Sequence, residues 1–181
     1  ALKGALAAHE DLIEPVPGSS RAVRTTAGPS PGKVAIVIGG GAGHEPAFWG
    51  YVGPGLADAA VIGNVFASPP PDPIIAATVE GGAGVLYIYG NFTGDVMNFD
   101  MAAETLEAEG LRIRSIVTTD DIASSPAEMK GTRRGVAGNV FTFKIAGAAA
   151  ARRLPLDECE AMARHANART YTMGLALEPC S

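Results

Sequence analysis

The sequence predicts an α/β fold in which a doubly wound, mostly parallel sheet carries helices on both faces. The first observation behind this prediction is that short apolar runs alternate with helical stretches along the chain. The second is that most of these runs end in segments dense in Gly, Pro, Thr, Asn and Asp, which are typical of functional loops on a rigid scaffold. Strands that alternate with helices are joined by right-handed crossovers, which make the sheet largely parallel.

The elements can be assigned in chain order. Residues 1–32 form a leader, polar and rich in Pro, Ser and Gly from 14 onward, that we expect to pack on the domain formed by 33–181. Apolar runs predict strands at 34–38, 59–62, 85–89, 112–117 and 172–177. Periodicity and start signals predict helices at 73–80, 96–109, 135–152 and 156–169. The segment Ser125-Pro-Ala-Glu128 has the cap, first-position proline and third-position glutamate that begin a helix.

Composition limits the functions that this chain can have. With 181 residues and 47% hydrophobic content it can bury the core of one domain. A formal net charge of −5, with only Arg133-Arg134 as a basic pair, argues against nucleic-acid and anionic-membrane partners. No apolar stretch has the length of a membrane span, and the first residues lack the features of a signal peptide. Cys159 and Cys180 have no metal-binding spacing, so we expect free thiols, no metal site and a cytoplasmic location.

A glycine cluster follows the first predicted strand and ends in a histidine, Gly39-Gly-Gly-Ala-Gly-His44-Glu-Pro46. The spacing does not fit the dinucleotide fingerprint, and no Lys-Ser or Lys-Thr pair follows as a phosphate-binding P-loop requires. What remains is a backbone that can approach a small ligand, with an imidazole that exchanges a proton near neutral pH. The alternative is a tight turn whose His44 only hydrogen-bonds a carbonyl group.

Four loops should converge at one edge of a parallel sheet, namely 39–46, 63–73, 90–95 and 118–124. His44 and Asp95 are the titratable side chains that stand out among them, and a hydroxyl substrate needs such a pair, one group to take its proton and one to orient it. Asp95 has a rival interpretation as the N-cap of the helix predicted at 96–109. Other residues have structural interpretations too: a turn for Asn91, a cap or solvent for Asp120 and Asp121, core or lid for Trp49 and Tyr51, and a surface position for Lys144.

Six ordered blocks carry a resemblance to a known family. They are 39–46 with 50–53, 66–72 (FASPPPD), 91–99 (NFTGDVMNF), 133–138 (RRGVAG), 144–149 (KIAGAA) and 173–177 (MGLAL). From Gly32 onward the sequence resembles the substrate-binding subunit, or N-terminal kinase domain, of dihydroxyacetone (glycerone) kinases. The resemblance implies a domain that binds a short ketose. It also implies that this domain binds no cofactor, and that a separate nucleotide-binding helical domain or subunit supplies the phosphoryl group from ATP with Mg²⁺ or from a phosphotransferase relay through ADP.

The same resemblance assigns roles to residues of this chain. Gly41, Ala42, Gly43 and His44 form the substrate loop, with His44 as general base. Asp95 hydrogen-bonds the substrate hydroxyl and assists proton transfer, and Gly90 and Asn91 complete the substrate site. The resemblance also implies a homodimer.

The sequence departs from the family at two points. The family usually has Lys immediately before the Asn-aromatic-Thr-Gly-Asp block, whereas this chain has Gly90, which would weaken binding or leave room for a longer ketose such as erythrulose. Family members also continue into a His-Gly-Glu-Pro segment that forms a covalent hemiaminal, and neither His9 nor His165 matches it. We therefore expect the first half of a longer substrate subunit. A non-catalytic ketose-sensing regulator and an unrelated nucleotide-binding domain are the alternatives.

Overall fold

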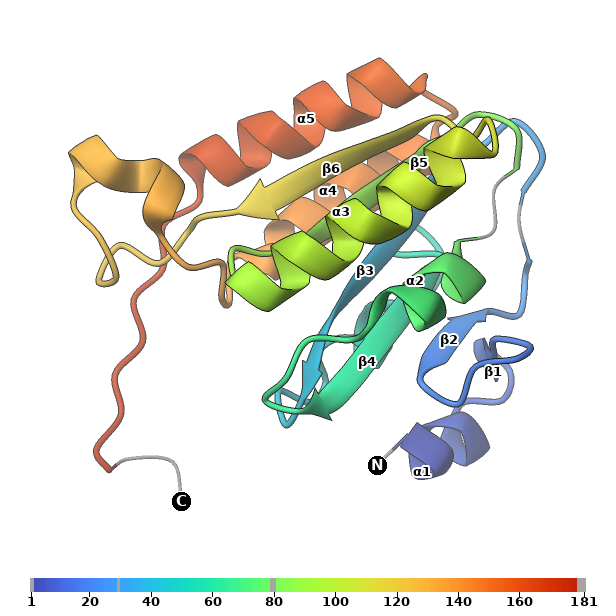
Figure 1. Cartoon of the computed structure of the whole chain (residues 1–181), viewed down its shortest axis with the longest axis horizontal. Helices are drawn as coiled ribbons and strands as arrows, with labels where there is room; N and C mark the ends of the chain where they lie inside the picture. The colour runs from blue at the N-terminus through green and yellow to red at the C-terminus, as the bar shows by residue number, and fades with distance from the viewer. Residues whose placement is uncertain (1, 29, 79–80, 179–181) are drawn as a thin grey trace.

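A six-stranded sheet forms the centre of the protein in the computed structural model, which describes residues 2–28, 30–78 and 81–178 (Figure 1). The strand order is β1-β2-β4-β3-β5-β6. β3, β4, β5 and β6 are parallel to one another, and β1 and β2 add an antiparallel edge. The expected mostly parallel sheet is confirmed. The strands are β1 (Ile13–Pro15), β2 (Ala22–Thr25), β3 (Ala35–Ala42), β4 (Ala59–Val65), β5 (Val85–Gly90) and β6 (Ile113–Thr118).

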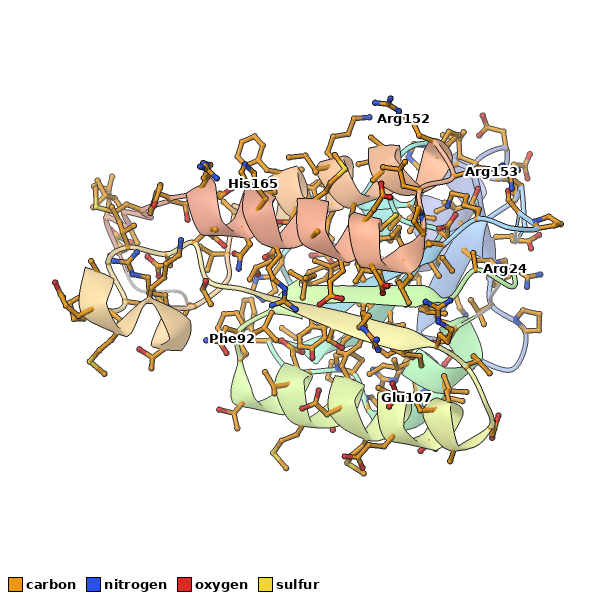
Figure 2. All side chains as sticks on the ribbon, turned by 90° about the horizontal axis from the view of Figure 1, so that it is seen from above. Arg24, Phe92, Glu107, Arg152, Arg153 and His165 are labelled. Carbon is orange, nitrogen blue, oxygen red and sulfur yellow. The ribbon has the colours of Figure 1, made fainter. Side chains whose placement is uncertain are left out.

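Helices cover both faces of this sheet, as the doubly wound prediction requires. Seen from above, α4 and α5 lie on one face and α3 on the other (Figure 2), and α2 packs beside α3. The helices are α1 (Leu2–Ala8), α2 (Pro71–Ala77), α3 (Thr93–Ala108), α4 (Asn139–Ala151) and α5 (Leu156–Arg169), with short 3₁₀ helices η1 (Trp49–Tyr51) and η2 (Ala127–Thr132).

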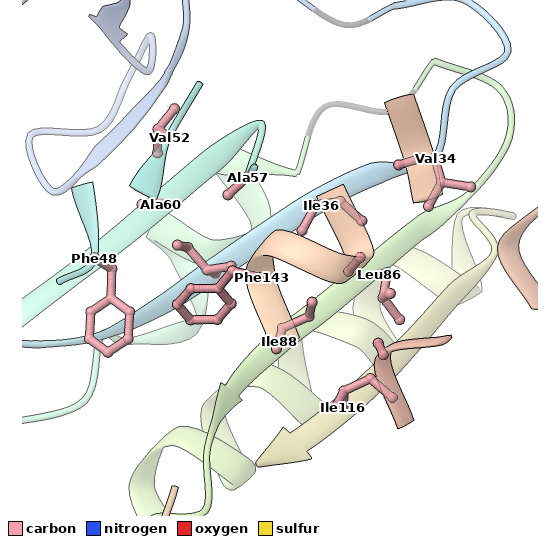
Figure 3. Packing of buried hydrophobic residues seen from close by; sticks show 14 of the residues in the cluster. Val34, Ile36, Phe48, Val52, Ala57, Ala60, Leu86, Ile88, Ile116 and Phe143 are labelled. Atoms are coloured by element: carbon pink, nitrogen blue, oxygen red, sulfur yellow. The ribbon is translucent and has the colours of Figure 1, made fainter. Parts of the chain in front are cut away.

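The two faces of the sheet have separate apolar cores. Alternate residues of β3 point to opposite faces, so Ile36 and Ile38 pack under α4 and α5 while Val37 packs under α2 and α3. In the first core Phe143 of α4 lies against Phe48, with ring centroids 6.4 Å apart (Figure 3). Each fully buried large apolar side chain stabilises the fold by roughly 1.5–3 kcal/mol. These cores fix the positions of the strand ends from which the loops emerge.

The segment 172–177 is not the strand that the sequence predicts. Only Thr172 makes a β-bridge, to Asp121, and the rest of the segment has no strand beside it. Leu175 is 89% exposed and Leu177 fully exposed. Figure 1 shows this part of the chain leaving the domain. An apolar run gives a strand only where a neighbouring strand accepts its hydrogen bonds, and the described chain supplies none here.

Two other predictions of elements need correction, and the leader contains elements that were not predicted. The leader contains a helix and two strands, α1, β1 and β2, which the polar composition of that region did not indicate. Predicted helix 135–152 begins only at Asn139, because 135–138 form a loop. Ser125 does not cap an α-helix: the 3₁₀ helix η2 follows it with Pro126 at the N-cap position, and the Ser125 hydroxyl pairs with Thr132 instead.

Cys159 lies in α5, as expected, and is buried and free. Cys180 lies outside the described residues. Lys144 is exposed on α4, in agreement with its predicted surface position. Across the described ranges, no helix combines the length and the apolar character needed to cross a membrane.

Candidate active site at the carboxyl edge of the sheet

The strand order places a switch point between β3 and β5. The chain leaves β3 on one side for β4 and later returns to the other side for β5. In open α/β sheets the crevice at the carboxyl ends of two such strands is where ligands bind. A cavity of about 600 Å³ opens at this point, between Gly40 and Gly41 of β3 and Gly90 of β5. We call it the switch-point cavity.

The glycines at the end of β3 are required by close packing. A Cβ atom on Gly40 would overlap the ring of Phe48, and one on Gly41 would lie 2.8 Å from the backbone nitrogen of Ala67. The backbone of β3 therefore lies against the Phe48 ring and the backbone of Ala67 shortly before it reaches His44. His44 lies at the cavity with its ring exposed, 5.3 Å from the ring of Phe66. An imidazole held in this way is accessible to a ligand in the cavity.

Asp95 lines the same cavity from the first turn of α3 and is 6% exposed. It is not the N-cap, because the helix begins at Thr93 and Phe92 occupies the cap position. The capping interpretation of Asp95 is therefore wrong. Its Oδ1 is buried and has no hydrogen-bond partner among the described residues. A buried carboxylate oxygen without a partner carries a desolvation penalty that a bound hydroxyl group could relieve.

Burial raises the pKa of Asp95 above its usual range, while hydrogen bonding from Ser68 and the electrostatic influence of His44 oppose that rise. Both side chains line the same cavity. Proton exchange between a basic imidazole and a substrate hydroxyl oriented by a carboxylate is chemistry that this arrangement can perform.

The remaining predicted site residues divide into two groups. Gly41 and Gly90 line the cavity together with His44 and Asp95. Ala42, Gly43 and Asn91 do not. The Asn91 amide instead donates hydrogen bonds to the carbonyl oxygens of Gly131, at 3.0 Å, and Arg133, at 2.8 Å. Its contacts are those of a residue that holds a loop, as the turn interpretation anticipated.

The gap expected beside Gly90 is absent. A Cβ atom at this position would lie 2.6 Å from the carbonyl oxygen of Gly135 and 3.0 Å from the Phe92 ring. A side chain at this position would meet the backbone of the 135–138 loop. The effect of Gly90 on the choice of ketose stays a prediction. Gly90 permits the close approach of two loops.

Three of the four predicted loops contribute to the cavity, and the fourth, 118–124, does not line it. Asp120 is buried and accepts hydrogen bonds from the backbone N–H groups of Val136, at 3.1 Å, and Gly138, at 2.9 Å. The solvent-facing alternative for Asp120 is therefore wrong. Asp121 is buried as well and forms an ion pair with Arg134 at 2.7 Å. This loop acts indirectly, by holding residues 135–138 against the cavity.

Several lining residues were not assigned to the site from the sequence. They belong to the loop after β4, the N-cap of α3, η1, the 135–138 loop and α4: Phe66, Ala67, Ser68, Phe92, Tyr51, Val136, Ala137, Asn139, Val140 and Phe143. A signal was present for many of them, because residues 66–68 and 136–137 lie in two of the six blocks of the resemblance. Among the described residues, no cluster of three His, Cys, Asp or Glu side chains could hold a metal ion.

Comparison with known proteins gives consistent results. The sequence matches the Dak1 domain over residues 3–181. It is 46% identical to an L-erythrulose 1-kinase from Mycolicibacterium smegmatis, over all of this chain and 32% of that protein. It is also 46% identical to the dihydroxyacetone-binding subunit DhaK of a PTS-dependent dihydroxyacetone kinase from Listeria innocua, over 97% of this chain and 53% of that subunit. The chain thus spans about a third to a half of the length of these relatives.

Solved structures agree with this result. The dihydroxyacetone kinase of C. freundii superimposes with a TM-score of 0.87 at 36% identity, over 94% of this chain and 32% of that one. The dihydroxyacetone kinase operon co-activator Dha-DhaQ superimposes with a TM-score of 0.80 at 36% identity, over 90% of this chain and 50% of that one. From the match along almost its whole length and the shared fold, the chain belongs to the Dak1 domain family.

Proposed function

We propose that this chain is the ketose-binding part of a dihydroxyacetone kinase-type phosphotransferase. It holds a short ketose in the switch-point cavity and deprotonates the hydroxyl that accepts the phosphoryl group. The observation that carries the proposal is that His44, on the loop after β3, and Asp95, in the first turn of α3, line one cavity where Asp95 Oδ1 has no partner among the described residues. The kinase relatives support the reaction class.

The reaction can be described through the groups of this chain. Before reaction, Asp95 orients the ketose hydroxyl by accepting its hydrogen bond. As the hydroxyl oxygen attacks the phosphorus atom, this proton passes to His44, and the bond between phosphorus and the leaving group of the donor breaks. A positioned base of this kind contributes typically about 10²–10⁴-fold to the rate. Further acceleration comes from positioning and from neutralising phosphate charge. We assign that neutralisation to ATP-bound Mg²⁺, or to an ADP-linked donor, on a partner domain or subunit. A homodimer and a cytoplasmic location complete the proposal.

Two neighbouring functions have specific support. Erythrulose kinases are among the relatives, so a four-carbon ketose is a candidate substrate alongside dihydroxyacetone. The likeness to an operon co-activator supports a ketose sensor without catalysis. The presence of both His44 and Asp95 at the cavity favours the enzyme.

The test uses the full-length protein with its phosphoryl donor and the variant His44→Asn, which keeps a polar side chain of similar reach but cannot take up the proton. We expect kcat to fall by about 10²-fold or more. The control is His165→Asn, an exposed histidine on α5, which should leave kcat unchanged. Ketose binding by calorimetry without turnover in the unmodified protein would favour the sensor, and near-normal turnover in His44→Asn would refute the base assignment.

A further inference from the structure

Phe66, which follows β4 and lines the switch-point cavity, has a backbone conformation that a bulky residue rarely adopts. Its φ angle is 53°, a positive value in the left-handed region that favours glycine. Its side chain is 57% exposed, so the ring gains little from burial. Neither the backbone nor the apolar core therefore accounts for a phenylalanine at this position. Residues that break local rules in this way cluster at functional sites.

The position of Phe66 is tied to the end of β3. Its backbone N–H donates a hydrogen bond to the carbonyl oxygen of Ala42, at 2.8 Å. Its ring lies on Gly43, where an added Cβ atom would come within 2.7 Å of the ring atom Cε1. Gly43 has a φ angle of 95°, so the backbone and the neighbouring ring both require glycine there. Two unusual backbone positions thus bring the phenyl ring against the residue before His44.

The same ring lies beside the His44 imidazole. The two ring centroids are 5.3 Å apart and the ring planes are tilted by 49°, which is within the range in which aromatic side chains attract each other. The hydrogen bonds around His44 are made by other groups: Gly43 N–H donates to Glu45 Oε2 and Ala47 N–H donates to the His44 carbonyl oxygen, both at 3.1 Å. The His44 ring takes part in neither bond. Packing against Phe66 is therefore the contact that limits rotation of this exposed imidazole.

We propose that Phe66 is a positioning residue that holds the His44 imidazole in the orientation needed to accept the proton of the ketose hydroxyl. This inference rests on the proposed function, because it concerns the proposed base. Phe66 acts through His44 and takes no proton itself. A general base must lie within hydrogen-bond reach of the proton that it takes, so a ring that turns away loses activity even when it stays at the cavity.

The first test measures kcat and KM separately for Phe66→Leu and Phe66→Tyr in the full-length protein with its phosphoryl donor. Leucine is apolar but lacks the flat ring, so kcat should fall by about tenfold while KM changes less than about twofold. Tyrosine keeps the ring, so kcat should stay within about twofold of the original value. The matched control is Phe141→Leu on α4, which should leave kcat unchanged, because Phe141 is also 57% exposed but does not line the cavity.

Two outcomes of this test would overturn the proposal. A raised KM with unchanged kcat in Phe66→Leu would mean that the ring contacts the ketose and does not position the base. Equal losses of kcat in Phe66→Leu and Phe66→Tyr would mean that the aromatic ring is not the feature that matters.

Phe66→Gly keeps the proposal testable if the leucine variant folds poorly. Glycine adopts a φ angle of 53° without strain, so this variant should have a Tm close to that of the original protein. It lacks the ring, so its kcat should still be about tenfold lower. A folded Phe66→Gly protein with normal kcat would contradict the role of the ring.

A further measurement does not depend on turnover. In ketose-free protein with ¹³C-labelled histidine, the signal of the His44 ring is identified by its absence in His44→Asn. Its relaxation should show a more mobile ring in Phe66→Leu and the original mobility in Phe66→Tyr and Phe141→Leu. If the mobility rises while His44→Asn retains normal turnover, the positioning contact stands and the proposed function fails. If the mobility is unchanged while His44→Asn is inactive, the role of Phe66 fails and the proposed function stands.

Discussion

The loop after β3 and the first turn of α3 hold His44 and Asp95 at the cavity in different ways. His44 sits on an exposed loop at the end of a glycine run, where water can solvate its ring. Asp95 is buried in a helix, with one oxygen unpartnered among the described residues and a raised pKa caused by that burial. The exposed base costs the fold little, whereas the buried carboxylate destabilises it when it is ionised. Residues strained or desolvated in this way concentrate at functional sites.

The largest effect that tests this comparison is the loss of activity in Asp95→Asn. The amide has the size of the carboxyl group but loses its charge, so it is a weaker hydrogen-bond acceptor and orients the hydroxyl poorly. We expect kcat/KM in the full-length protein to fall by about 10²-fold. Steady-state kinetics alongside Asp100→Asn, a change at another α3 carboxylate, would show whether the effect belongs to position 95. Equal losses in both variants would contradict the assignment.

Gly90→Lys should reduce stability rather than change substrate choice. The new side chain would place its Cβ 2.6 Å from the Gly135 carbonyl oxygen, and overpacking against backbone typically costs about 1–3 kcal/mol. Chemical denaturation should show this loss, whereas Gly131→Ala, where a Cβ meets nothing within 4 Å, should remain close to the original stability. If Gly90→Lys is stable and changes the ratio of kcat/KM for dihydroxyacetone and erythrulose, position 90 has room for a side chain and influences substrate choice. That result would contradict the prediction.

Asn91 offers a way to separate holding a loop from binding substrate. Asn91→Ala removes two hydrogen bonds to loop carbonyl groups, so unfolding free energy should fall by about 1–2 kcal/mol. KM for the ketose should change less than twofold under conditions where the variant is folded. A raised KM with unchanged stability would instead place the Asn91 amide on the substrate.

The smallest expected effects are changes in the free energy of unfolding when Asp95 or His44 is replaced. Because the folded-state pKa of Asp95 is raised, the ionised carboxylate opposes folding at neutral pH, and this penalty disappears as the pH falls through the folded-state pKa. Asp95→Asn should therefore be more stable than the original protein at neutral pH, by about 1 kcal/mol, with the difference shrinking in acid. His44→Asn should stay within about 0.5 kcal/mol, as exposed substitutions usually do. Urea denaturation at several pH values measures these differences. An Asp95→Asn variant that is less stable than the original protein at neutral pH would show that the carboxylate is well paired, contrary to the prediction.

Several parts of the fold were readable from the sequence for clear physical reasons. The strands β3, β4 and β5 are apolar runs, because a parallel sheet covered on both faces buries most residues of its inner strands. The edge strand β6 is buried only in part. The two residues with candidate roles in proton transfer were found because each follows such a run. In contrast, β1 and β2 have three and four residues, too few for a periodic pattern to show. The apolar run at 172–177 was wrongly predicted to be a strand. Such a run shows that a strand is possible, but it does not show that a neighbouring strand is present to pair with it.

The sequence by itself determined the alternation of strands and helices, and with it the edge at which His44 and Asp95 meet. It also carried the six blocks that mark the family. Only the tertiary structure decided that Asp95 lies inside the helix, with one oxygen that has no partner in the described part of the chain. It also decided that Asn91 bonds to the neighbouring loop and that Gly90 permits close packing. The physical reason is that periodicity and composition record which residues are buried in an element, whereas contacts between loops depend on segments far apart in the chain.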